Sequence, residues 1–188
     1  MSYALFRLVV ALWIVFEIGL AVHNSFARRG AVVRDRGSKL LIALAIALGF
    51  SLAFRSRVVA GAAIGLPSGW LTAIAMLFFL PGLIIRAHSV IMLGRFFTTT
   101  VTVRPGQRLI QSGLYARIRH PGYLGSLLIF VGLAVSFRNW LSAALLLLPI
   151  VPAFLNRIRV EERGLTEAFG EEYAEYSKTT KRLLPGLY

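Results

Sequence analysis

Hydrophobic and polar positions divide the first half of the chain into long apolar stretches joined by short charged connections. Residues 3–22 form the first stretch, and a helix of that length, rising about 1.5 Å per residue, matches a membrane core of about 30 Å. Residues 40–54 form a shorter stretch, which could continue past two arginines to residue 66. Residues 70–93 form the third, with Pro81 expected to kink it. These stretches predict three membrane helices.

The second half begins with a polar segment and then returns to the membrane. Residues 94–121 are rich in Gly, Thr and Arg and predict a loop rather than a span. Residues 123–137 and 140–156 are apolar, and the two-residue break between them predicts an antiparallel helical hairpin. The tail from residue 157 has a charged helical pattern that is expected to end at Pro185-Gly186. The chain is therefore predicted to be an all-α polytopic membrane protein with about five transmembrane helices.

Composition supports a membrane protein and limits the chemistry. Of the 188 residues, 57% are hydrophobic and 15% are charged. With glycine included and tyrosine left out, the apolar share exceeds the roughly 45–50% of soluble domains. The chain has no cysteine and three widely spaced histidines, so we expect neither disulfides nor a metal site. The net charge of +13 is explained by basic membrane-flanking loops rather than by nucleic acid.

The basic residues also predict an orientation. Most of them lie in the connection 27–39, in the loop 94–121 and in the tail. The opposite ends of the predicted helices carry four arginines, Arg7, Arg55, Arg57 and Arg138. The positive-inside rule therefore places the N-terminus outside and the C-terminus, together with the loop 94–121, in the cytoplasm. In a bacterium this would be the inner membrane.

The loop and the tail carry most of the residues suited to chemistry. His120 precedes Pro121, which favours an extended backbone, so its ring could hold a ligand or simply bond a lipid head group. Arg157 and Glu161 lie four positions apart and share a helix face, whereas Glu162 lies about 140° around from Arg157. These charges form either a surface ion pair or a site at the membrane boundary.

One acidic residue lies within an apolar stretch, and several common motifs are absent. Glu17, within the first apolar stretch, could pair with Arg7 or Arg86 and is interpreted as structural. The glycine-rich dinucleotide fingerprint, the P-loop, the H-E-x-x-H motif and the G-x-S-x-G motif are all absent. The common nucleotide-binding and hydrolase devices are therefore excluded.

A series of short motifs runs through the last hundred residues. The motifs are LGRFFT at 93–98, LIQSGLY at 109–115, RHPGYLG at 119–125, RIRVEE at 157–162 and FGEEYxxY at 169–176. In their order and spacing they resemble the isoprenylcysteine carboxyl methyltransferase family. The resemblance implies an integral membrane methyltransferase that uses S-adenosylmethionine without a soluble nucleotide domain. In that family the cofactor lies between the His-Pro loop and the C-terminal helix, and a lipid-like substrate enters from the bilayer.

The resemblance also assigns roles to individual residues. It implies that Arg157 and Glu162 are catalytic. It implies that the cofactor contacts Gln107, Leu109, Ile110, Tyr115, His120, Pro121, Tyr123 and Glu161. Gln107 stands where the family often has histidine, although glutamine can still form hydrogen bonds. For a carboxylate acceptor, Arg157 could hold one oxygen; for an amine or thiol acceptor, Glu162 could orient it or take its proton.

The apolar pattern thus predicts three N-terminal helices in residues 1–93, and the resemblance implies a methyltransferase core in residues 94–188, which includes the hairpin 123–156. The favoured reaction methylates the carboxylate of a lipophilic, isoprenylcysteine-like or prenylated acceptor that enters from the bilayer. Three alternatives stay open: a phospholipid or small-molecule N- or S-methyltransferase, a sterol-reductase-like enzyme that uses reduced nicotinamide, and a membrane protein without enzymatic activity. The sequence indicates no oligomeric state.

Overall fold

The structure is a computed structural model, which describes residues 3–26, 32–33, 37–98, 102–103, 106 and 108–184. Its helices and strands, in chain order, are α1 (Tyr3–Phe26), β1 (Val32–Val33), α2 (Ser38–Ser56), η1 (Ala60–Ala62), α3 (Ser68–Leu93), η2 (Gly94–Phe96), β2 (Thr102–Val103), η3 (Gly113–Ala116), α4 (Pro121–Ser136), α5 (Trp140–Phe169) and α6 (Glu171–Thr179). The two short strands pair with each other and antiparallel. The predicted helical architecture is confirmed.

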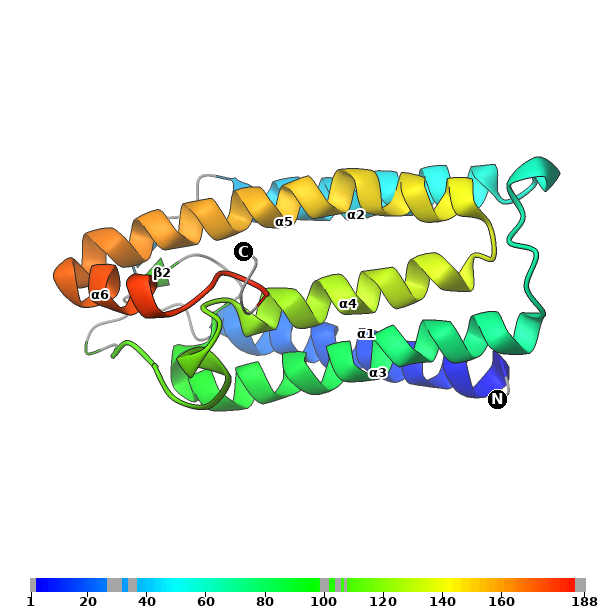
Figure 1. Cartoon of the computed structure of the whole chain (residues 1–188). Helices are drawn as coiled ribbons and strands as arrows, with labels where there is room; N and C mark the ends of the chain where they lie inside the picture. The colour runs from blue at the N-terminus through cyan, green and yellow to red at the C-terminus, as the bar shows by residue number, and fades with distance from the viewer. Residues whose placement is uncertain are drawn as a thin grey trace.

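The long helices form two layers that run along one direction (Figure 1). Helix α2 packs along α5 in one layer, and α3 packs along α4 in the other, with α1 beside α3. The N-terminus lies at the end that carries η1, and α6 lies at the opposite end with the segment that joins α3 to α4. Each layer pairs a helix from before residue 93 with a helix from after it, so the predicted boundary at residue 93 does not coincide with the division between the layers.

Among the residues that the structure describes, four helices are long and apolar enough to cross a membrane, namely α1, α2, α3 and α5. Helix α4 has 16 residues and would span about 24 Å, which is shorter than a typical hydrocarbon core. Many large apolar side chains on the outer faces of the bundle are exposed, among them Leu12, Leu44 and Leu148. Since such faces suit lipid rather than water, the chain is an integral membrane protein.

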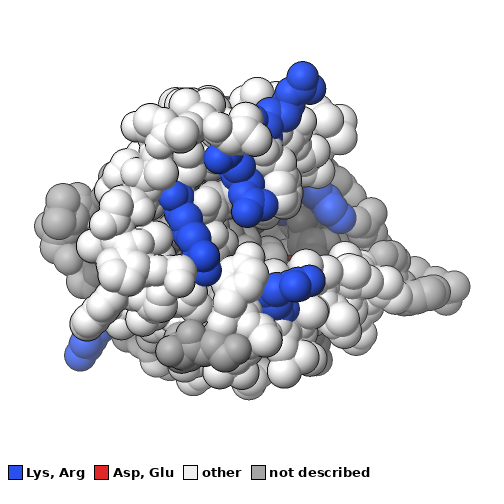
Figure 2. Space-filling view, turned by 90° about the vertical axis from the view of Figure 1, so that its right-hand side faces the viewer, with Lys and Arg blue, Asp and Glu red and all other residues white. Residues whose placement is uncertain are grey.

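The two loops at the η1 end are tied together. Asn139 caps α5 by accepting a hydrogen bond from the Ser142 N–H (3.0 Å), and its Nδ2 donates to the Val59 carbonyl (2.9 Å). This confirms the predicted hairpin between α4 and α5. The stretch 40–54 corresponds to α2, and its possible continuation to residue 66 does not occur, because α2 ends at Ser56 and the chain turns there through η1 to reach Asn139. Figure 2 shows basic side chains and no acidic ones on this end of the molecule.

The tail also differs from its prediction. The charged helix does not continue to Pro185, because it breaks at Gly170, whose positive φ of 54° suits glycine, and α6 then ends at Thr179. The next residues pair with the segment before α4: the Arg119 N–H donates to the Lys181 carbonyl (2.7 Å) and the His120 N–H to the Arg182 carbonyl (3.0 Å). The tail thus holds the entry to α4 in place.

Glycines bring α3 and α4 unusually close. A Cβ atom added at Gly125 would lie 2.6 Å from the Gly82 carbonyl oxygen, and one at Gly132 would lie 2.6 Å from the Ala75 carbonyl oxygen. Such small residues allow backbones to approach within a membrane. Helix α3 continues through Pro81 from Ser68 to Leu93. The tight α3–α4 contact fixes the position of His120, which stands at the start of α4.

Candidate active site

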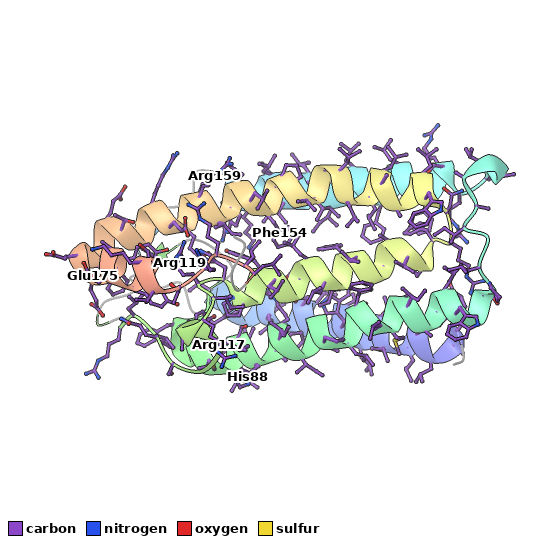
Figure 3. The ribbon with its side chains drawn as sticks, viewed as in Figure 1. His88, Arg117, Arg119, Phe154, Arg159 and Glu175 are labelled. Atoms are coloured by element: carbon purple, nitrogen blue, oxygen red, sulfur yellow. The ribbon has the colours of Figure 1, made fainter. Side chains whose placement is uncertain are left out.

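A cavity of about 420 Å³ lies between the two layers and is lined by residues from α1 to α6. Six apolar lining residues of α1, α2, α4 and α5 lie farther from the α6 end than the polar lining residues of the same helices; they are Trp13, Ile42, Ile46, Phe50, Phe130 and Phe154. The polar lining residues lie toward the α6 end and include Glu17, Arg86, His120, Arg157 and Glu161. In Figure 3, Phe154 points from α5 into the space between the layers. The cavity therefore joins a charged mouth to an apolar interior.

Arg157 anchors the polar end of this cavity. Its side chain is 3% exposed, and its Nε donates to the Tyr123 hydroxyl (3.2 Å) while its Nη1 donates to the Ser38 hydroxyl (2.7 Å). The Tyr123 hydroxyl in turn donates to the Glu161 carboxylate. Helices α2, α4 and α5 thus converge on one guanidinium, and the predicted shared face of Arg157 and Glu161 is confirmed.

Glu162 lies on a different side of α5. Its carboxylate accepts hydrogen bonds from Arg119 Nε (3.1 Å) and Arg182 Nε (2.9 Å), and it lines a shallow outer depression rather than the cavity. The cause is the 100° step between successive helical residues, which turns Glu162 away from the face of Arg157. The structure therefore does not bring Glu162 into the cavity beside Arg157.

Arg119 links the segment before α4 to the tail. Its Nη1 donates to the carbonyls of Ser177 (2.8 Å) and Thr180 (2.5 Å), while its Nε bonds Glu162. Figure 3 shows Arg119 directed between α5 and α6, whereas Arg159 points away from the outer face of α5. Since its donors are committed to the tail, Arg119 fixes the cavity wall.

His120 is the N-cap residue of α4 and is 4% exposed. Its ring stacks on Tyr123 with centroids 5.6 Å apart. Its Nε2 lies 3.5 Å from a Glu162 oxygen but has no hydrogen-bond partner within the described residues. The imidazole is therefore held firmly while one of its nitrogens is left available.

The other residues expected to contact a cofactor are mostly close by. Leu109, Ile110 and Tyr115 line the cavity. Pro121 is fully buried beneath it and is not among the lining residues. Gln107 lies outside the described residues.

Tyrosines from the loop and from α6 line the polar end of the cavity. The Tyr176 hydroxyl donates to the Tyr115 carbonyl (2.7 Å). Burial raises the pKa of Tyr176 to about 12 and raises the pKa of Tyr115 above its usual value of 10. Both hydroxyls therefore stay protonated at neutral pH and serve as donors rather than as bases.

Sequence reasoning missed several lining residues that come from the first three helices. Ser38 bonds Arg157 across 119 positions, and no local pattern indicates such a partner. For Glu17, two partners were open, and the structure selects Arg86, whose Nε and Nη2 donate to the two carboxylate oxygens at 2.9 and 3.1 Å. Glu17 also lines the cavity, so it contributes to the site as well as to the fold.

Three buried side-chain polar atoms have no hydrogen-bond partner within the described residues: Trp13 Nε1, His120 Nε2 and Tyr173 Oη. All three residues line the cavity. Buried polar groups are normally hydrogen-bonded, so a bound molecule would satisfy them. No group of three His, Asp or Glu residues that could hold a metal ion occurs in the part of the chain that the structure describes.

Comparison with known proteins gives a consistent picture. A model of the isoprenylcysteine carboxyl methyltransferase family matches residues 73–167. Protein-S-isoprenylcysteine O-methyltransferase B from Arabidopsis thaliana is 31% identical over 118 residues, covering 62% of this chain and 60% of the relative. A probable protein-S-isoprenylcysteine O-methyltransferase from Oryza sativa subsp. indica is 38% identical over 106 residues, covering 55% of this chain and 56% of the relative.

The chain thus spans 60% or less of the length of these two relatives. A solved structure of the eukaryotic intramembrane Ras methyltransferase ICMT matches with a TM-score of 0.62 at 22% identity, covering 77% of this chain and 52% of that chain. This likeness shows a shared fold. Glu17, Ser38 and the whole of α1 and α2 lie outside the residues that the family model matches.

Proposed function

This chain belongs to the isoprenylcysteine carboxyl methyltransferase family, and we propose that it transfers a methyl group from S-adenosylmethionine to a lipophilic acceptor in the membrane. The observation that carries the proposal is the cavity itself, in which every buried polar atom without a partner among the described residues belongs to a lining residue. One end of the cavity is charged and the other is apolar, as a lipid-like acceptor with a polar reacting group requires.

The residues at the polar end fit the cofactor. Tyr115, Tyr123 and His120 provide aromatic walls, and Leu109 and Ile110 provide apolar ones, which suits an adenosyl group. The free nitrogen of His120 can bond to a polar group of the ligand. When bound, S-adenosylmethionine would supply its sulfonium methyl group: an acceptor atom would attack the methyl carbon in line with the carbon–sulfur bond, and the sulfur would leave as a neutral thioether.

The charge of the cavity favours a carboxylate as the acceptor. Its cationic lining residues are Lys39, Arg86, Arg108, Arg119 and Arg157, against the two carboxylates of Glu17 and Glu161. This surplus of positive charge attracts an anion and disfavours a protonated amine. An isoprenylcysteine-like acceptor fits, since its carboxylate would lie at the charged mouth and its hydrocarbon chain against the apolar residues.

The main task of the protein in such a reaction is alignment. The reacting oxygen, the methyl carbon and the sulfur must lie in line, and water must be excluded. We assign Arg157 to hold the acceptor carboxylate, because its position is fixed by Ser38 and Tyr123. Between the two glutamates, the cavity-lining Glu161 is the better candidate for direct contact with ligand, and Glu162 acts as a positioning residue through Arg119.

We further propose that the α6 end of the bundle faces the cytoplasm. Most lysines and arginines flank this end, as the positive-inside rule requires. Because the natural chain has no cysteine, single cysteines at Arg57 and Lys178 can report the orientation in intact cells. A membrane-impermeant maleimide should label the cysteine at 57 and spare the one at 178; the reverse labelling would invert the assigned topology.

Calorimetric titration of the detergent-purified protein with S-adenosylhomocysteine tests the proposal. We expect micromolar binding, about −8 kcal/mol, that His120→Ala weakens at least tenfold. Arg117→Ala is the matched control, since Arg117 lies on the same segment but is exposed and does not line the cavity.

Reduced nicotinamide and methyl-transfer assays complete the test. Binding of reduced nicotinamide without binding of S-adenosylhomocysteine would favour the reductase alternative, and no binding of either by folded protein would overturn the proposal. With a farnesylated cysteine as acceptor, Arg157→Ala should abolish methyl transfer while the protein still binds S-adenosylhomocysteine. An active Arg157→Ala protein would refute the role assigned to Arg157.

A further inference from the structure

A second arginine in the cavity is prepared to receive an anion. We propose that Arg86, held by Glu17 of α1, is a carboxylate-binding subsite in which the Nη1 edge of its guanidinium contacts the ligand. The inference rests on the proposed function for the identity of the ligands. It assigns a role to α1, which lies outside the residues that the family model matches.

The Arg86 side chain is fixed on two sides. Its Nε and Nη2 donate to both oxygens of Glu17, at 2.9 and 3.1 Å, and its guanidinium carbon lies 5.4 Å from the centre of the Phe97 ring. A bidentate ion pair together with an aromatic face sets both the plane and the rotation of a guanidinium. Arg86 therefore loses little further side-chain freedom when a ligand binds.

The remaining edge of this guanidinium has no partner. Within the described residues, Arg86 Nη1 donates no hydrogen bond, although the Arg86 side chain is only 12% exposed. The other buried arginines of the cavity differ, since Arg119 donates to carbonyls of the tail and Arg157 donates to Ser38 and Tyr123. Arg86 Nη1 is not among the buried polar atoms without a partner, so it keeps access to the cavity, where a ligand can accept its hydrogen bond.

The space beside Nη1 is open because Gly122 has no side chain. A Cβ atom added at Gly122 would lie 3.4 Å from Arg86 Nη1 and 3.6 Å from the Ser89 Cβ. Gly122 lies in the first turn of α4, where the helix dipole also favours negative charge. A planar carboxylate fits between Nη1 and this helix end, and the neighbouring Glu17 would repel a second anion placed on its own side of Arg86.

Two molecules in the proposed reaction carry a carboxylate, namely the acceptor and the methionine part of the cofactor. Two pairs of compounds, each with and without the carboxylate, distinguish these two sources. S-adenosylhomocysteine is compared with 5′-methylthioadenosine, which lacks the amino-acid carboxylate. S-farnesyl-N-acetylcysteine is compared with its carboxamide. Binding of all four compounds is measured by calorimetry on the full chain in detergent.

We expect Arg86→Gln to weaken the binding of one carboxylate-bearing compound at least tenfold. The matching compound without the carboxylate should bind as tightly as it does to the unmodified protein. The ligand that weakens identifies the source of the carboxylate. The double variant Glu17→Gln with Arg86→Gln covers the case in which an unpaired Glu17 prevents folding, and it should show the same selective loss.

Gly122→Ala provides an independent test that leaves the ion pair intact. The added methyl group makes ordinary contacts, so the variant should fold, yet it occupies the space beside Nη1 and should weaken the same ligand. Gly19→Ala is the control, since nothing lies within 4 Å of its Cβ position. If the unmodified protein binds S-adenosylhomocysteine and the Arg86 and Gly122 variants bind all four compounds unchanged, the subsite is refuted while the proposed function stands.

Discussion

A very close backbone contact between α3 and α4 gives a quantitative prediction about stability. At Gly132 of α4, an added Cβ would lie 2.6 Å from the Ala75 carbonyl oxygen and 3.0 Å from both the backbone nitrogen and the Cβ of Phe79. An ordinary contact begins at 3.4 Å, so the nearest atom is about 0.8 Å too close. That atom belongs to the α3 backbone and cannot rotate away. Gly132→Ala must therefore move one helix relative to the other.

The size of the effect follows from two opposing contributions. Replacing glycine by alanine within a helix stabilises it by up to about 1 kcal/mol, and Gly19→Ala in α1 receives this gain with no steric conflict. Overpacking costs about 1–3 kcal/mol. Relative to Gly19→Ala, we therefore expect Gly132→Ala to be less stable by about 1–3 kcal/mol, which corresponds to about 2–4 °C in Tm for each kcal/mol.

Thermal unfolding of both variants in the same detergent and at the same heating rate measures this difference. Gly125→Ala adds a functional readout, because its Cβ would lie 2.7 Å from the Arg86 backbone nitrogen at the ligand cavity. It should reduce ligand binding as well as stability, whereas Gly132→Ala acts at a distance from the polar end. If Gly132→Ala unfolds at or above the temperature of Gly19→Ala, close backbone packing between α3 and α4 is not what holds this layer together.

Three further substitutions test the connections around the site. Arg119→Ala should lower stability by about 2 kcal/mol because the Glu162 carboxylate keeps only Arg182 of its two arginine partners and two carbonyls lose their side-chain donor, and equal proteolysis rates for Arg119→Ala and the exposed Arg117→Ala would contradict this. Asn139→Ala should cost about 1–2 kcal/mol in thermal unfolding through loss of the α5 cap and of the bond to the η1 turn; an unchanged Tm would show that the cap is dispensable. Tyr176→Phe should cost about 1 kcal/mol in denaturant unfolding, while Tyr173→Phe, whose hydroxyl has no partner within the described residues, should cost nothing; equal losses would refute this.

The helices could be predicted because membrane spans leave a strong local signal. The apolar stretches 3–22, 70–93 and 140–156 correspond to α1, α3 and the first part of α5. The apolar pattern left open whether the second helix continues to residue 66, because its end depends on a distant partner, the Asn139 side chain, which bonds to the turn after α2. The break at Gly170 carried a local signal, since glycine favours the positive φ found there, but the charged pattern on either side of it suggested continuity.

The site residues also divide into those that a local pattern predicts and those that depend on packing between distant segments. His120, Tyr123, Arg157 and Glu161 belong to motifs whose spacing is local, and the structure brings all four to one cavity. Ser38 and the pairing of Glu17 with Arg86 depend on the packing of the first three helices against the core, which no spacing encodes. The sequence therefore predicted the shared half of the site more completely than the half contributed by α1 and α2.

Glu161 and Glu162 are adjacent in the sequence, but they lie on different sides of α5 and have different contacts. Glu161 faces the cavity and receives a hydrogen bond from Tyr123, so its charge acts directly on anything bound beside Arg157. Glu162, the next residue of α5, accepts hydrogen bonds from Arg119 and Arg182 and so joins the His-Pro segment to the tail. A carboxylate at position 162 can therefore be essential without touching a ligand, since losing it would release the segment that carries His120. Glu162→Gln should accordingly weaken S-adenosylhomocysteine binding and Tm together, whereas Glu161→Gln should change binding or turnover with little change in Tm; loss of turnover alone in Glu162→Gln would return the direct role to Glu162.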